Sequence, residues 1–129
     1  MKSKNLLLWV CRIVAAIIMI QTLYFKFTGA PESVYIFSQV GMEPEGRYAT
    51  AIAELVASIL LLIPQTSLVG ASIALFIMIG AIATHVSILG IEVMNDHGQL
   101  FIYAIIVAVA SFYIILRYTR KKKRLPYES

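Results

Sequence analysis

The chain has 129 residues, of which 60% are hydrophobic and only 14% are charged, and its mean hydropathy is +0.82. A soluble domain of this length cannot bury so much apolar surface, so the composition excludes an ordinary soluble enzyme and indicates an integral membrane protein. The formal net charge of +4 fits attraction to anionic lipid, and we expect contact with the lipid bilayer and no nucleic acid partner.

The first apolar segment, residues 6–26, follows Lys2 and Lys4. At about 1.5 Å per residue it can cross a hydrocarbon core about 30 Å thick. A secretory signal is the weaker interpretation, because Arg12 interrupts the apolar run and no small-residue cleavage site is evident. We therefore expect a retained first span, with Arg12 and Lys26 on one face of the helix.

The connection from Lys26 to Glu45 contains the signals of a short helix. Pro31 suits the helix start, Glu32 suits its first turn, and Gly41 marks its end. Its apolar side chains can face lipid or the mouth of a bundle, so we expect it to lie in the outer membrane interface. Two roles remain open for this helix, a lid and an inert connector.

Three further apolar segments predict spans over residues 46–63, 68–91 and 99–118, and a basic tail covers residues 119–129. The expected fold is all-α: a membrane-spanning four-helix bundle with a short interfacial helix between spans 1 and 2. We expect residues 1–129 to form a single integral membrane domain. Small residues suit close helix packing in the second and third spans. They are Ala49, Ala53 and Ala57 in the second span, and Gly80, Ala83, Thr84 and Ser87 in the third.

Charge distribution predicts the orientation. Lysine and arginine residues stand beyond both ends of the expected bundle, and acidic residues fill the first and third connections. Basic residues are retained on the cytoplasmic side of a membrane, so both termini should be cytoplasmic, as an even number of spans requires. The acidic connections should therefore face the outside.

Glu54, in the middle of the second apolar segment, is the main candidate for a functional residue. A carboxylate near the bilayer centre opposes insertion by about 2.5–3.5 kcal/mol. Such a group faces the bundle interior, pairs with another polar group or stays protonated. We favour a binding or proton-handling role over a purely structural hydrogen bond between helices.

Other polar residues of the spans lie at depths close to that of Glu54, within about 7–12 Å of the outer ends. They are Gln21, His85 and Tyr103. If these faces converge, a polar pocket opens outward, and Lys26 can fold inward from its rim. Arg12 lies deeper. His85 suits a proton relay or a quinone contact, although a satisfied core histidine is the plainer alternative.

Several chemistries have no residues to support them. Cys11 is the only cysteine, so an intrachain disulfide and a two-cysteine thiol relay are excluded. His85 and His97 lie far apart without metal-ligand spacing, so we expect no metal site. No ligand set for haem or an iron–sulfur cluster is present. We expect no tightly bound cofactor, and no self-contained redox or hydrolytic site is visible.

Specific stretches resemble the DoxX-like family of small four-helix integral membrane proteins. They are Arg12 early in the first span, YFKFTGAPE at its end, AELVASILLLIP around Glu54, and His85. The resemblance covers nearly all of residues 5–118. It implies a four-helix bundle in which Arg12, Lys26, Glu54 and His85 match the family's recurrent polar positions. It also favours a bacterial inner membrane.

Three functions stay open. The resemblance favours an accessory or quinone-contacting subunit of a membrane oxidoreductase system, in which quinone is the candidate ligand. The alternatives are a proton-coupled small-molecule transporter that titrates Glu54, and an assembly factor or chaperone for membrane proteins. We expect a membrane protein partner or a homo-oligomer. Loss of redox activity on deletion favours the first function, pH-dependent uptake the second, and a lost partner complex the third.

Overall fold

The computed structural model describes residues 2–93 and 96–123, and all regular structure in them is helical. The elements are α1 (Lys2–Thr28), α2 (Pro31–Gln39), α3 (Glu45–Leu62), the short 3-10 turn η1 (Pro64–Thr66), α4 (Ser67–Thr84), the π-helix η2 (His85–Leu89) and α5 (Gln99–Lys123). The all-α prediction and the short helix after the first long one are confirmed. Residues 124–129 of the predicted basic tail lie outside the described residues.

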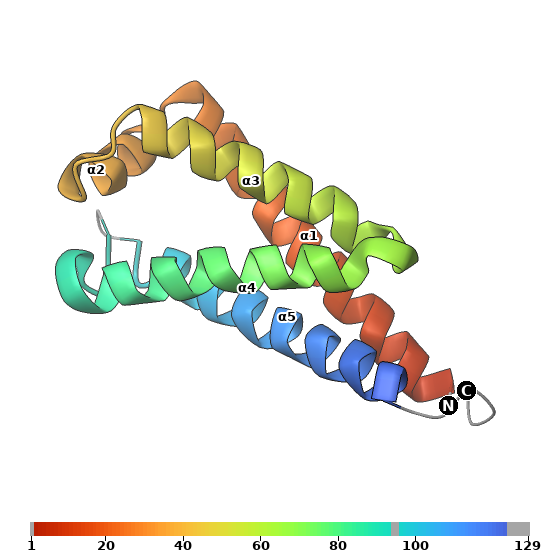
Figure 1. Ribbon diagram of the computed structural model, residues 1–129. Helices are drawn as coiled ribbons and strands as arrows, with labels where there is room; N and C mark the ends of the chain where they lie inside the picture. The colour runs from red at the N-terminus through yellow and green to blue at the C-terminus, as the bar shows by residue number, and fades with distance from the viewer. Residues whose placement is uncertain (1, 94–95, 124–129) are drawn as a thin grey trace.

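Four long helices pack around one another, and each contacts two others. Helix α1 packs against α3 and α5, and α4 packs against the same two helices. Helix α2 lies at the end where α1 finishes and α3 begins, and it also touches η2 (Figure 1). The start of α1 and the end of α5 lie together at the opposite end of the molecule (Figure 1).

Among the described residues, three helical segments are long and apolar enough to cross a membrane. They are Asn5–Thr28, Pro64–Leu89 and Gln99–Arg120, and they cover three of the four predicted spans. Helix α3 occupies the position of the fourth, but Glu45, Arg47 and Glu54 make it more highly charged. The protein is therefore an integral membrane protein with three candidate spans, and α3 packs between two of them.

Large apolar side chains cover much of the outside of the bundle. Phe76, Ile17 and Val109, from three different helices, are each more than half exposed. So large an exposed apolar surface would be unfavourable in water. It is what we expect of helices whose outer faces contact lipid.

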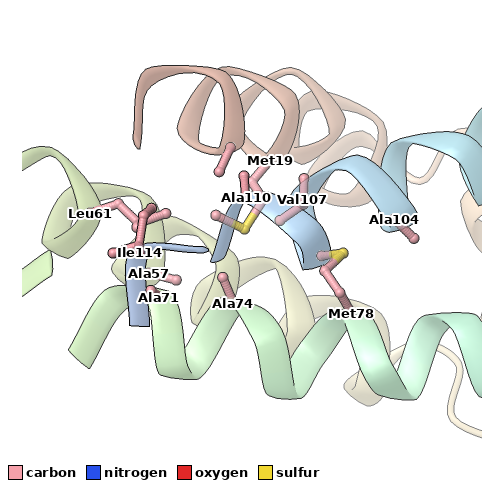
Figure 2. Packing of buried hydrophobic residues seen from close by; sticks show 11 residues of the cluster. Met19, Ala57, Leu61, Ala71, Ala74, Met78, Ala104, Val107, Ala110 and Ile114 are labelled. Carbon is pink, nitrogen blue, oxygen red and sulfur yellow. The ribbon is translucent and has the colours of Figure 1, made fainter. Parts of the chain in front are cut away.

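The buried core consists mainly of small residues, so the helix backbones approach closely (Figure 2). Ala57 and Leu61 of α3 face Ala71 and Ala74 of α4 in this cluster (Figure 2). At Gly70 the backbones of α3 and α4 are so close that a Cβ atom there would stand 2.6 Å from the Leu61 amide nitrogen.

The predicted small face of the third span is wrong. Gly80, Ala83 and Ser87 are exposed, whereas Gly70 and Ala71 are buried. The short turn η1 holds the adjoining ends of α3 and α4 together, so small residues are needed near that turn. Towards their other ends, both helices instead line a cavity.

Candidate functional site

A cavity of about 680 Å³ opens among the helices at the end of the bundle where α2 lies. Small-molecule sites commonly have volumes of about 300–1,000 Å³, with apolar walls and a few polar groups. Most of the lining residues here are apolar. Five of the six predicted candidates also line it: Gln21, Lys26, Glu54, His85 and Tyr103.

Helix α2 covers part of this cavity with one of its faces. Ser33, Ile36 and Phe37 follow helical spacing and line the cavity, as does Val40 immediately after the helix. Gly29, with φ of +71°, turns the chain from α1 into α2, a backbone conformation that glycine adopts without steric cost. Helix α2 therefore lies against the cavity. This position is compatible with both roles left open for it, a lid and an inert connector.

The centre of the polar lining is an ion pair between α1 and α3. Lys26 Nζ lies 2.8 Å from Glu54 Oε1, and the two side chains are 17% and 4% exposed. At 2.8 Å the ammonium lies within hydrogen-bond distance of this oxygen, and no other described residue donates to it. Lys26 therefore compensates the charge, and the carboxylate keeps lone pairs for a further donor.

Helix periodicity explains why Glu54 points inward. Arg47, Ala51, Glu54, Ser58 and Leu61 are all buried, at intervals of three or four residues along α3. The same face packs against α1, so Glu54 meets Lys26 in the last turn of that helix. A lysine in that position also suits the negative end of the helix dipole.

His85 is the first residue of η2, where α4 changes to π-helical geometry. Its Nδ1 atom lies 2.9 Å from the carbonyl oxygen of Gly90, and its ring packs edge-on against Phe101. Because a carbonyl only accepts hydrogen bonds, Nδ1 carries a proton, and in the corresponding neutral tautomer Nε2 is an acceptor. Single-turn π segments occur frequently at functional sites.

Two further cavity residues are Tyr103, near the start of α5, and Asp96, in the loop before it. Tyr103 Oη accepts a hydrogen bond of 2.7 Å from Gln99 Nε2, so its own hydroxyl hydrogen stays available. Asp96 accepts hydrogen bonds from the backbone amides of Val93, Gly98 and Leu100. Burial raises the pKa of the Asp96 carboxyl, but these amides outweigh burial and bring the pKa below its ordinary value. Asp96 is thus a carboxylate that organises the loop before α5.

Arg12, the sixth predicted candidate, lies away from the cavity. It is only 1% exposed, its Nε donates to Leu61 O at 2.8 Å, and its terminal nitrogen donates to Leu62 O at 3.0 Å. The guanidinium also stacks over the ring of Trp9, 3.7 Å from its centroid. Arg12 therefore caps the end of α3, where carbonyl groups lack partners within the helix.

Arg47 is a buried residue to which sequence reasoning gave no role. It forms hydrogen bonds of 2.8 Å with each carboxylate oxygen of Glu43, and it also donates to the carbonyl oxygen of Lys26. The guanidinium therefore connects the end of α1 with the loop before α3, next to the Lys26–Glu54 pair. A lone arginine four residues after Glu43, at the expected outer end of a span, was the available signal.

Comparison with known proteins gives the same family that the sequence resembles. The sequence model described as the DoxX-like family matches residues 10–113. The chain belongs to the DoxX-like family. No curated protein and no solved structure matches this DoxX-like chain significantly. The matched residues include five cavity-lining candidates, from Gln21 to Tyr103, and also Arg12.

The cavity of this DoxX-like protein carries both hydrogen-bond donors and hydrogen-bond acceptors. Over residues 2–93 and 96–123, no three His, Cys, Asp or Glu side chains come together as a metal site. The cavity offers the Lys26 ammonium and the Tyr103 hydroxyl as donors, and the Glu54 carboxylate and His85 Nε2 as acceptors. Such a set suits an apolar molecule that carries a small polar head.

Proposed function

We propose that this DoxX-like protein is an accessory, quinone-contacting subunit of a membrane oxidoreductase system. The observation that carries the proposal is the cavity itself, which combines mainly apolar walls with the buried Lys26–Glu54 pair. Quinones have the complementary character, because an apolar ring and tail carry a few polar oxygens. A lipid-soluble molecule can also reach a cavity within a membrane protein without first entering water.

The polar residues fit such a head group. Lys26 and Tyr103 can donate hydrogen bonds to ring oxygens, and the Glu54 carboxylate can accept one from a hydroxyl group. Quinone, when bound, would supply the redox chemistry. This chain's residues bind and orient the head group and hold protons, and a partner subunit carries the centre that exchanges electrons.

The proposal includes a topology in which α3 is a fourth span. Helix α3 has 18 residues, the same number as α4, and packs between α1 and α4. Two of its charges, Glu45 and Arg47, lie in its first turn, and Glu54 is compensated by Lys26. Both termini are then cytoplasmic, in a bacterial inner membrane, and the cavity opens toward the outer side.

A photoreactive quinone tests the binding role in native membranes. We expect labelled peptides from α2, α3 or η2, protection by excess unlabelled quinone, and stronger labelling in Glu54→Gln, whose amide can donate to a quinone carbonyl. Glu45→Gln makes the same chemical change on the same helix outside the cavity, so it should label like the wild type. The labelled protein should also co-purify with an oxidoreductase partner.

Other results would select a different function. Labelling that excess quinone does not reduce would contradict quinone binding at the cavity. Uptake by reconstituted protein that follows a pH gradient and disappears in Glu54→Gln would identify a transporter. Normal quinone-linked electron flux with reduced recovery of a partner protein would identify an assembly factor.

A further inference from the structure

We infer that the cavity binds the reduced, hydroxyl-bearing form of its ligand, a quinol, in preference to the oxidised quinone. This inference rests on the proposed function and specifies its ligand. It follows from the difference between the two forms. A quinol hydroxyl both donates and accepts hydrogen bonds, whereas a quinone carbonyl only accepts them.

Glu54 is one hydrogen-bond acceptor in the wall of the cavity. Its side chain is buried, it lines the cavity, and Lys26 Nζ lies 2.8 Å from Oε1. Lys26 occupies only part of the acceptor capacity of the carboxylate, because a carboxylate has about four lone-pair sites. A ligand hydroxyl can therefore also donate to Glu54, and hydrogen bonds to a buried carboxylate are stronger than those between neutral groups. A quinone would instead bring carbonyl lone pairs towards a carboxylate.

His85 is a second hydrogen-bond acceptor, and it lines the cavity from a different element, η2. Its Nδ1 proton is donated to Gly90 O, and in this tautomer of the neutral ring Nε2 is the acceptor. Glu54 on α3 and His85 on η2 are thus acceptors carried by different elements. A quinol carries two hydroxyl groups at different positions on its ring, so one molecule has a donor for each.

The donors in the cavity do not reverse this preference. The Tyr103 hydroxyl and the Lys26 ammonium can donate to a quinone carbonyl, but they can equally donate to a quinol oxygen. The donors therefore serve both forms of the ligand, whereas the acceptors serve only the reduced form. A site discriminates between two ligands when one of them leaves a buried polar group without a partner. Here a bound quinone would give Glu54 no hydroxyl donor, whereas a bound quinol would.

The test uses the full chain in lipid nanodiscs and three probes that share one short tail. The probes are a fully substituted benzoquinol, its quinone and its dimethyl ether, kept under anaerobic conditions. Full ring substitution prevents addition to Cys11, and empty nanodiscs correct for partition into lipid. We expect the quinol to bind at least ten times more tightly than the quinone or the ether. A ten-fold preference raises the midpoint potential of the bound two-electron couple by about 30 mV.

Variants of Glu54 and His85 test whether these two acceptors cause the preference for quinol over quinone. In Glu54→Gln the ratio of quinol to quinone affinity should fall at least several-fold, because the amide can also donate to a carbonyl. His85→Phe, which keeps an aromatic ring beside Phe101, should also lower this ratio. Glu45→Gln should leave it unchanged.

Different failures have different meanings. Equal affinity for quinol and quinone overturns the inference and leaves quinone contact in place. Equal affinity for quinol and its ether also overturns it, because hydroxyl groups are then not recognised. Binding of none of the three probes overturns both the inference and the proposed function. An unchanged quinol preference in Glu54→Gln and His85→Phe overturns the assignment to these acceptors.

Discussion

Arg12 and Arg47 cap opposite ends of the same helix pair. Arg12 of α1 donates to the carbonyls of Leu61 and Leu62 at the end of α3, and Arg47 of α3 donates to the carbonyl of Lys26 in the last turn of α1. Each arginine thus satisfies backbone acceptors that the partner helix cannot satisfy itself, next to the negative end of its dipole. Unpaired carbonyls are most costly where water is excluded.

Removing the Arg12 side chain should destabilise the pair. In Arg12→Met, Leu62 O loses its side-chain donor and Leu61 O keeps only Ser67 Oγ. We expect the free energy of unfolding to fall by about 1–3 kcal/mol, the range for leaving a buried polar group unpaired. Unfolding by a denaturing detergent in mixed micelles measures it. Arg120→Met, at an exposed position on α5, should change stability by less than about 0.5 kcal/mol. Equal losses in the two variants would refute the capping role.

The approach of α3 and α4 gives a second prediction, with a control in the same helix. Gly70→Ala places a Cβ atom 2.6 Å from the Leu61 nitrogen and 2.9 Å from the Ala57 oxygen, so the backbones must separate. Overpacking of this kind costs about 1–3 kcal/mol. Gly80→Ala meets nothing within 4 Å and should be neutral or stabilising, because alanine favours helix more than glycine does. Thermal unfolding of both variants compares them directly, and similar midpoints would contradict the close contact.

Features that follow from helical periodicity, or from the cost of burying a charge, could be predicted from the sequence. Arg12, Ala16, Met19 and Leu23 share a buried face of α1, as the helical period predicts. Glu54 is buried in α3, and Pro31 begins a short helix. Each of these features depends on residues within one element.

Features that depend on contacts between elements could not be derived in the same way. The partners of Arg12 are backbone carbonyls on another helix, and no side-chain pattern marks them. The π-helix at His85 goes together with contacts of the His85 ring to Gly90 O, just after η2, and to the ring of Phe101 on α5. Arg47 turns inward because Glu43 and Lys26 O meet it there. Tertiary packing selects among local alternatives in all three cases.

The contact between Glu43 and Arg47 should respond to pH. Hydrogen bonds from the Arg47 side chain hold the pKa of Glu43 below its ordinary value, against the opposing effect of burial. The contact should be fully present above the ordinary glutamate pKa of about 4.3 and should weaken as the pH falls through the lowered value. Hydrogen-exchange protection factors over residues 40–47 should follow this course. In Glu43→Gln, protection should no longer change across this window, and a full transition in that variant would assign it to another group.

Removing one partner of the Lys26–Glu54 pair should lower the free energy of unfolding more than replacing both partners by apolar residues. Glu54→Leu leaves the ammonium without its partner, although Lys26 can turn towards the rim, so the loss should be below the about 3–5 kcal/mol typical of a broken buried pair. Glu54→Gln should lose less, because the amide keeps an acceptor and adds donors. The double variant Lys26→Met with Glu54→Leu should recover most of the stability of the wild type. A double-mutant cycle measures the coupling, and additive losses would show that the two side chains do not interact.

The number of spans can be decided at the two ends of α3. Gln39 ends α2 before this helix and Gln65 lies in the turn after it, and both side chains are exposed. In a Cys11→Ala background, a cysteine at position 39 should react with an impermeant thiol reagent in intact cells, because the first connection lies outside in the four-span topology. A cysteine at position 65 should react only after the membrane is opened, because the turn is then cytoplasmic. Reaction of both positions from the same side would place α3 on one side of the membrane and leave three spans, with the two termini on opposite sides.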